Sequence, residues 1–173
     1  MQKISIEQKF DCTLDVLLRA RMERYNHLER FPELKNVKVL EEEKSETSLK
    51  QKRSIHIAES LPPVLATLLP PGSDTLVEDS FFDLKNNIHT FTVTPGGNLD
   101  KIFTIKGVST YKELDTEHSV RIYELEITSR AFIVGPVVET TIAEIYRKNL
   151  EKDKKSIGDF ILMLNEKKSD ERN

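Results

Sequence analysis

This chain of 173 residues, with a net charge of −3, is long enough for one domain with a sizeable core and lacks the basic excess typical of nucleic-acid-binding domains. Its single cysteine, Cys12, excludes a disulfide framework within the chain. Residues 1–12 lack the apolar core of a secretory signal, and no apolar run approaches the ~20 residues of a membrane-spanning helix. We therefore expect a cytoplasmic domain that does not act on nucleic acid.

The N-terminal stretch predicts a strand followed by helical turns. Residues 3–10 place alternate apolar side chains on one side, which is strand periodicity. Asp11 and Thr13 can then cap a helix that ends near residues 25–27. A short second helical turn is expected before Pro32, because the residue that precedes a proline disfavours the helical backbone.

The middle of the chain predicts six more strands. Short alternating or apolar segments follow one another, separated by polar turns that are typical of antiparallel hairpins. These segments are residues 37–43, 47–58, 75–84, 88–95, 101–113 and 119–130.

One apolar segment, LPPVLATLLPP at residues 61–71, interrupts this series. Paired prolines at both ends bracket one or two helical turns. We interpret it either as an amphipathic turn that caps the core or as a flap over the mouth of a cavity.

Residues 137–164 predict one long helix with a polar gap in its inward stripe. Steps of 3.6 residues give the stripe Val138, Ile142, Ile145, Asn149, Asp153, Ile157, Phe160 and Leu164. Two polar residues, Asn149 and Asp153, stand in its middle. This gap predicts a hollow beneath the helix.

The predicted order is strand, one or two helices, six strands and a long helix. Because the strands follow one another without crossover helices, this is an α+β fold. We expect a strongly curved, seven-stranded antiparallel sheet around the C-terminal helix, with the first strand beside the last ones. Residues 1–167 form this single domain, and residues 168–173 form a polar, frayed tail.

This order, with a C-terminal helix gripped by a sheet, resembles the START-like (SRPBCC, helix-grip) superfamily. The segment LPPVLATLLPPGSDTLVEDSFFDLKNNIHTFTV is similar to the matching stretch of PRELI-type phospholipid-transfer domains. The segment GPVVETTIAEIYRKNLEKDKKSIGDFIL resembles a bacterial family of START-like domains without an assigned function. The resemblance implies a deep cavity between helix and sheet that takes a lipid, polyketide, sterol or hormone-like ligand.

Alternation along the strands predicts which side chains line this cavity. The aromatic residues expected to face inward are Phe91, Phe103, Tyr111 and Tyr123. Gly107 and Ser109 on the same face are small, which again predicts a hollow.

Three polar residues complete the predicted ligand-binding set: Arg53, Asn149 and Asp153. They would hold the polar head of an otherwise apolar ligand. Two alternatives stay open: a buried Arg53–Asp153 ion pair, or a helix rolled so that Asn149 and Asp153 meet water.

No metal or cofactor is expected. The four histidines (His27, His56, His89 and His118) lack the paired spacing of metal ligands. The sequence also contains no phosphate-binding loop, dinucleotide fingerprint or nucleophile elbow.

Three functional hypotheses follow. The first is a non-catalytic protein that binds or transports a hydrophobic small molecule or lipid. The second is a polyketide cyclase/dehydratase-like enzyme, for which Asp153, His89 or Tyr111 would supply the general acid or base. The third is a partner-binding domain without a ligand.

Four cations lie close together in the sequence: Lys44, Lys50, Lys52 and Arg53. Near a cavity mouth they would favour a transient contact with a membrane that carries anionic lipids. A solvated strand face is the alternative, because several glutamates lie beside them. The sequence does not predict an oligomeric state.

Overall fold

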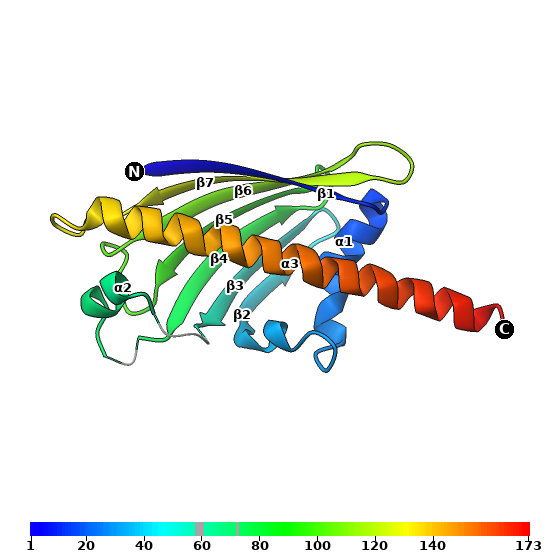
Figure 1. Cartoon of the computed structure of the whole chain (residues 1–173), viewed down its shortest axis with the longest axis horizontal. Coiled ribbons are helices and arrows are strands. Elements are labelled where there is room, and N and C mark those ends of the chain that lie inside the picture. The colour runs from blue at the N-terminus through cyan, green and yellow to red at the C-terminus, as the bar shows by residue number, and fades with distance from the viewer. Residues whose placement is uncertain (58–60, 72) are drawn as a thin grey trace.

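The computed structural model describes residues 1–57, 61–71 and 73–173, and it consists of one antiparallel sheet with helices on its concave side (Figure 1). The strands are β1 (Gln2–Phe10), β2 (Val37–Lys44), β3 (Ser48–His56), β4 (Thr75–Asp83), β5 (Ile88–Pro95), β6 (Thr104–Glu113) and β7 (Ser119–Thr128). The helices are α1 (Leu14–Glu23), α2 (Pro63–Leu68) and α3 (Gly135–Glu171), with the short 3-10 helices η1 (Arg24–Asn26) and η2 (Pro32–Asn36).

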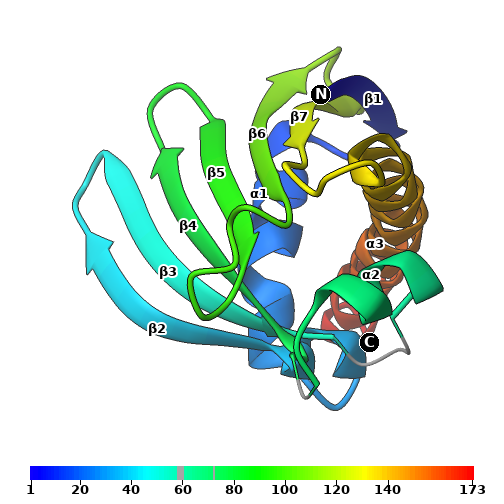
Figure 2. The same cartoon turned by 90° about the vertical axis from the view of Figure 1, so that its left-hand side faces the viewer.

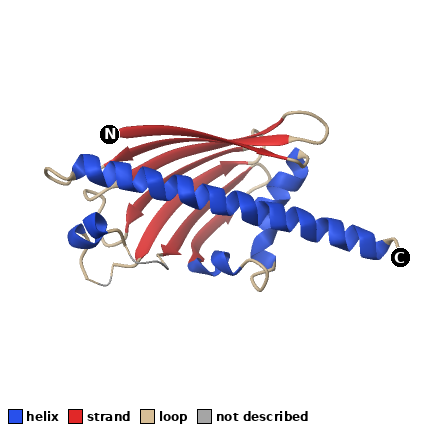
Figure 3. Cartoon of the chain, in the orientation of Figure 1, coloured by secondary structure: helices blue, strands red, loops and turns tan. Residues whose placement is uncertain are grey.

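The predicted fold class is confirmed. The seven strands lie in the order β1-β7-β6-β5-β4-β3-β2, so the first strand pairs with the last one and every other neighbour is consecutive. All pairs are antiparallel. Figure 3 shows that the helices cover one face of the sheet and that α3 crosses it.

The first helical region agrees with the prediction and is followed by one more turn than expected. Thr13 caps α1 as expected, since its hydroxyl accepts a hydrogen bond from the Val16 N–H. A hydrogen-bonded turn precedes Pro32 as predicted, since the Phe31 N–H donates to the His27 carbonyl at 3.0 Å, and a further turn, η2, begins at Pro32. Proline lacks an N–H that a first turn does not need, so it starts a turn more easily than it ends one. The end of the predicted strand 47–58, at Ala58, lies outside the described residues.

The long helix α3 extends beyond the predicted residues 137–164 at both ends and has 37 residues. Residues 168–171, expected in a frayed tail, continue the helix with exposed polar side chains. α3 packs against β1 and β7, with α2 near its start and α1 further along (Figure 2). Figure 2 shows that the sheet is curled, with β1 and β7 beside α3 and β2 at its far edge.

The core divides into two apolar clusters along α3. The first apolar cluster surrounds the N-terminal part of α3 and includes Ile4, Leu65, Leu69, Phe91, Val93, Phe103, Ile105, Leu125, Ile127, Val138, Ile142 and Ala143. The second apolar cluster surrounds its C-terminal part and includes Phe10, Leu17, Ala20, Phe31, Leu34, Leu49, Phe82, Tyr111, Ile157, Phe160 and Met163. The part of the interior between them is mostly polar.

The strand β2 forms one of the two edges of the sheet, the one away from β1, and nearly all its side chains are exposed. Its pairing with β3 shifts register between Val39 and Glu41, which is a β-bulge. Two carboxylates and a lysine follow Glu41 along the edge. Charges and bulges are the usual protection of an exposed edge strand.

Replacing Phe160 by alanine tests whether the end of α3 is docked. Phe160 is 0% exposed and its ring lies 6.2 Å from that of Phe31, so Phe160→Ala should lower the free energy of unfolding by about 3–5 kcal/mol. Urea denaturation measures the change. Leu162→Ala, at an exposed position on the same helix, should change stability by less than about 0.5 kcal/mol. Equal effects of the two substitutions would contradict the docking.

Candidate functional site beneath the long helix

A carboxylate held by two arginines occupies the middle of α3. Asp153 accepts hydrogen bonds from Arg121 Nη1 of β7 at 2.8 Å and from Arg24 Nη2 of η1 at 3.0 Å. Both guanidinium groups are buried, while the Asp153 side chain is 29% exposed. The three side chains therefore tie α3 to the sheet and to the end of α1.

Gln8 of β1 links the same arginine to the backbone of α3. Its amide nitrogen donates to the Leu150 carbonyl at 2.9 Å, and its amide oxygen accepts from Arg121 Nη2 at 2.6 Å. The side chain thus bridges β1, β7 and α3. This contact fixes which face of α3 turns toward the sheet.

A second ion pair lies on neighbouring strands. Arg53 of β3 stands opposite Glu78 of β4, and Arg53 Nη2 lies 2.6 Å from Glu78 Oε1. Arg53 Nη1 also donates to the Tyr25 hydroxyl at 3.1 Å. Glu78 is buried, so this pair places two opposite charges on the concave face of the sheet.

The charges set the protonation of the site. Burial alone would raise the pKa of Asp153, but Arg121 and Arg24 outweigh it and hold that pKa below its usual value. Burial, together with the charges of Arg21 and Arg53, lowers the pKa of His89 to about 2. Asp153 is therefore ionised and His89 neutral near pH 7.

Three aromatic rings from different elements meet beside these charges. The Phe91 ring of β5 lies 6.5 Å from the Tyr146 ring of α3, which is nearly parallel to it, and 6.3 Å from the Tyr123 ring of β7. The Arg121 guanidinium lies 5.1 Å from the centre of the Tyr123 ring. We call this region the midsection; it comprises Gln8, Arg24, Arg53, Glu78, Phe91, Arg121, Tyr123, Tyr146 and Asp153.

The two tyrosines of the midsection combine dense surroundings with contact to solvent. Burial raises the pKa of both Tyr123 and Tyr146, since their phenolates would be poorly solvated. Both residues are nevertheless only partly buried. The same holds for Arg53 and for Ile6, which stands opposite Tyr123. A fully packed core leaves no such access.

The midsection contains four of the seven predicted binding residues: Arg53, Phe91, Tyr123 and Asp153. Phe103 lies in the first apolar cluster and Tyr111 in the second. The Tyr111 hydroxyl accepts a hydrogen bond from Arg21 Nε at 3.2 Å.

The expectation that Asn149 faces the sheet is wrong, because its side chain is exposed. The inward face of α3 passes through Tyr146 and Leu150 instead, one position away from Asn149. Of the two alternatives for Asp153, the buried ion pair comes nearer to the structure, with Arg121 and Arg24 as partners in place of Arg53.

The hollow predicted above Gly107 and Ser109 is filled. A Cβ atom built on Gly107 would lie 2.2 Å from Cζ of Phe91 and 2.7 Å from Cδ2 of Leu125. Glycine is therefore needed at this position so that the Phe91 ring can lie against β6. Ser109 is fully buried, and its hydroxyl lies 3.5 Å from Nδ1 of His89.

Five residues of the midsection were missed by sequence reasoning: Gln8, Arg24, Glu78, Arg121 and Tyr146. Strand parity contained the signal for two of them. Gln8 lies on the same face of β1 as Ile4, Ile6 and Phe10. Arg121 lies on the same face of β7 as Tyr123 and Leu125. Each polar residue thus lay on a face that was already assigned to the interior.

The four clustered cations do not form one patch. Lys50 and Lys52 point away from the concave face, whereas Arg53 points into it. Lys52 lies 4.0 Å from Asp79, across on β4. The structure therefore gives no support to a basic membrane-binding surface on β3.

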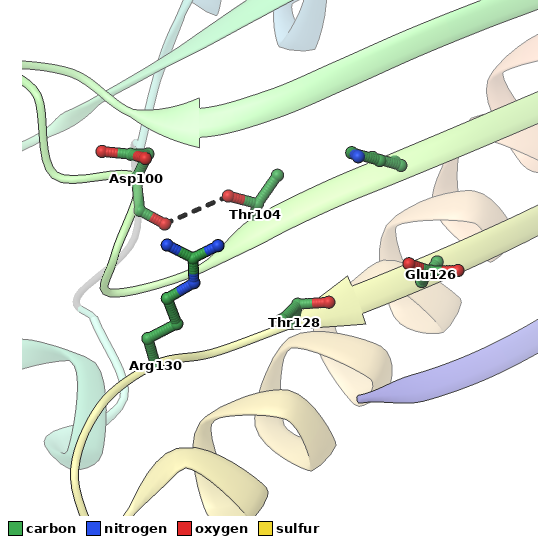
Figure 4. A pocket seen from close by; sticks show the side chains of 6 residues that line it. Asp100, Thr104, Glu126, Thr128 and Arg130 are labelled. Carbon is green, nitrogen blue, oxygen red and sulfur yellow. Dashed lines mark hydrogen bonds between the residues drawn. The ribbon is translucent and has the colours of Figure 1, made fainter.

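Two shallow depressions lie on the outer face of the sheet, away from α3. One is lined by charged and hydroxyl side chains of β6, β7 and the adjoining loops, namely Asp100, Thr104, Lys106, Glu126, Thr128 and Arg130 (Figure 4). The other lies over β3 to β6 and includes the half-exposed Phe81. Neither contains Asp153, Arg121 or Arg53.

The described part of the chain shows no group of three His, Cys, Asp or Glu side chains arranged to hold a metal ion. Among the same residues, no helix combines the length and the apolar character needed to cross a bilayer. Every buried side-chain nitrogen and oxygen described in the structure has a hydrogen-bond partner.

The sequence profile of one protein family, described as "Protein of unknown function (DUF2505)", matches residues 5–161. No curated protein gives a significant match to the sequence.

Similar solved structures include TTHA0849 from Thermus thermophilus (TM-score 0.61, 12% identity, covering 94% of this chain and 99% of that one). The Zhui aromatase/cyclase from Streptomyces sp. R1128 matches with a TM-score of 0.60 and 10% identity over 92% of this chain and 93% of its own. Norcoclaurine synthase from Thalictrum flavum, in complex with dopamine and hydroxybenzaldehyde, matches with a TM-score of 0.58 and 13% identity over 94% and 87%. These likenesses show the fold, which is the START-like, helix-grip fold.

Replacing Asp153 by asparagine tests the ion-pair network. Asp153→Asn leaves Arg121 and Arg24 buried without a carboxylate, so it should lower the free energy of unfolding by about 3 kcal/mol, the lower end for a broken buried pair because Asp153 is partly exposed. Urea denaturation at pH 7 measures the loss. Asp159→Asn, at an exposed position of α3, is the matched control and should be nearly neutral.

The stability that Asp153 contributes should disappear in acid. Its pKa is lower in the folded than in the unfolded chain, so the contribution is complete above about pH 4 and is lost as the pH falls through the folded pKa. The difference in unfolding free energy between the wild type and Asp153→Asn should therefore shrink below about pH 4. A difference that stays constant from pH 7 to acid would contradict this account.

Proposed function

Because this chain belongs to the family described as "Protein of unknown function (DUF2505)" and has the START-like fold, we propose that it binds a hydrophobic, lipid-like ligand in the midsection. The ligand would lie between the sheet and α3. The observation that carries the proposal is the residual solvent access of Tyr123, Tyr146 and Ile6, on the inner faces of β7, α3 and β1. In a domain with a completely filled interior, large side chains at these inward positions would be fully buried.

The residues of the midsection suit a ligand with two chemically different parts. Phe91, Tyr123 and Tyr146 offer an aromatic wall for an apolar part. The Arg53–Glu78 and Arg121–Asp153 pairs offer hydrogen-bond donors and acceptors for a polar head. Ligand pockets usually combine mostly apolar walls with a few such polar groups. The norcoclaurine synthase complex contains dopamine and hydroxybenzaldehyde, which also have an aromatic and a polar part.

Binding or transport is better supported than catalysis. Asp153 is held by two arginines, which lowers its affinity for a proton, and His89 is neutral throughout the ordinary pH range. Burial opposes ionisation of Tyr111, but Arg21 and Arg121 lower its pKa. Tyr111 stands opposite Arg121 in the β6–β7 register, but its side chain is buried in the second apolar cluster and its hydroxyl is engaged by Arg21. The three groups considered for a cyclase/dehydratase-like reaction are therefore ion-paired, neutral or buried, which does not favour that reaction.

A larger side chain at Ile6, which stands opposite Tyr123 of the midsection, should weaken binding. We expect the full chain to bind a dansyl-labelled undecanoic acid saturably, and Ile6→Trp to weaken that binding on the order of tenfold or more. Leu162→Trp, at an exposed position in the C-terminal part of α3, should leave the affinity unchanged. Fluorescence titration measures both, and thermal unfolding checks that each variant is folded.

Two results would contradict the proposal. One is the absence of probe binding by the wild type together with no lipid found by native mass spectrometry or organic extraction of the purified protein. The other is unchanged probe affinity in a folded Ile6→Trp variant. The first result would favour a partner-binding domain without a ligand, and the second would place the bound probe outside the midsection.

A further inference from the structure

The loop between β7 and α3 presents large apolar side chains to solvent. Phe132 is 89% exposed and Ile133 is 81% exposed, and Val137 in the first turn of α3 is also exposed. Residues 131–138 read AFIVGPVV and contain no charge. Single exposed apolar residues are ordinary on protein surfaces, but a run of them at a protruding tip indicates an interaction site.

The tip of this loop is strained. Ile133 has a φ of 67°, and the Val134 N–H donates to the Phe132 carbonyl at 2.8 Å across it. This is a γ-turn with positive φ, a rare conformation that glycine would adopt far more easily than a β-branched residue. The turn points two apolar side chains outward, and such local strain is often retained where it serves an interaction.

The base of the loop is firmly held. The Ser129 N–H donates to Glu139 at 2.9 Å, and the Arg130 N–H donates to the Lys101 carbonyl at 3.0 Å. The Ala131 carbonyl accepts from the Gly135 N–H at 3.0 Å. Hydrogen bonds on both sides therefore define the position of the tip.

The two ends of the molecule differ in character. The loop lies at the same end of the molecule as α2 (Figure 1). The helix α2 belongs to the segment 61–71, which contains no charged residue. In the antiparallel sheet, the turns that join β2 to β3, β4 to β5 and β6 to β7 lie at the opposite end. Those turns are rich in charge, with the sequences EKSET, DLKNN and LDTEH. The two most exposed of the large apolar side chains described in the structure, Phe132 and Ile133, thus lie at the end that carries α2.

We propose that this end docks on a lipid bilayer, with Phe132 and Ile133 inserted among the headgroups and upper acyl chains. A narrow, protruding tip offers much less than the ~1,000 Å² that a stable protein interface requires, whereas two apolar side chains suit shallow insertion. Arg130 and Lys101 at the base of the loop would lie at the depth of the phosphates, with Asp100 beside them. Insertion of the two apolar side chains therefore contributes most of the binding to the bilayer, and anionic lipids increase that binding only slightly.

A tryptophan at the tip reports insertion directly, because the chain contains no other tryptophan. On addition of phosphatidylcholine vesicles, with or without phosphatidylglycerol, Phe132→Trp should shift its emission to shorter wavelength. Lipids with brominated acyl chains should quench it. Leu162→Trp, exposed on the far half of α3, is the matched control and should show neither effect. An unshifted and unquenched Phe132→Trp spectrum would overturn the proposal.

Vesicle co-sedimentation gives a second readout on the unlabelled protein. Phe132→Asp should reduce binding to the same vesicles by roughly tenfold or more, since a carboxylate resists insertion, while Leu162→Asp should bind like the wild type. Equal sedimentation of Phe132→Asp and the wild type would contradict the proposal. So would a wild-type dimer that Phe132→Asp converts to a monomer, because a second copy would then cover the loop.

This inference does not depend on the ligand of the midsection. Phe132→Asp should still bind dansyl-labelled undecanoic acid in solution, because Phe132 lies outside the midsection. Loss of vesicle binding with retained probe binding is therefore the expected pattern. Failure of the probe experiment alone would leave the membrane proposal standing.

Discussion

The buried guanidinium of Arg121 is the constraint around which the rest of the interior is arranged. A charge removed from water is tolerated only when it is paired and hydrogen-bonded. Arg121 meets this requirement with Asp153 of α3 and Gln8 of β1, and its face lies against Tyr123. Because these partners come from three elements, the requirement of one side chain determines how α3, β1 and β7 are placed together. The Gln8 contact to the Leu150 carbonyl extends the same constraint to the rotation of the helix.

A polar layer at this position divides the core into two apolar clusters. Each cluster buries part of α3 on one side of its middle, so the helix is held before and after the segment that faces ion pairs and partly accessible aromatic rings. This division separates the residues that stabilise the fold from those proposed to bind a ligand. The clusters carry most of the packing energy, and the midsection can keep solvent access without loosening the ends of the helix.

Sequence patterns predicted most of the fold and part of the site. Strand periodicity and turn chemistry were sufficient for the order and approximate limits of the strands, because both are local properties of the chain. The inward face of α3 is not determined by the local sequence. Steps of 3.6 residues led to Asn149, whereas contacts with Gln8 and the arginines turn Tyr146 and Leu150 toward the sheet. The space above Gly107 was misread for a similar reason, since nothing near it in the sequence shows that the Phe91 ring fills it.

The bulged edge strand β2 has a consequence for how this protein behaves at high concentration. An open sheet ends in a row of backbone donors and acceptors that another chain could extend, as in fibril growth. The shift of register at Val39 and Glu41 breaks that row, and the adjacent carboxylates would repel a second identical edge. Residues 41–44, with the sequence EEEK, thus oppose self-templated aggregation at this edge of the sheet.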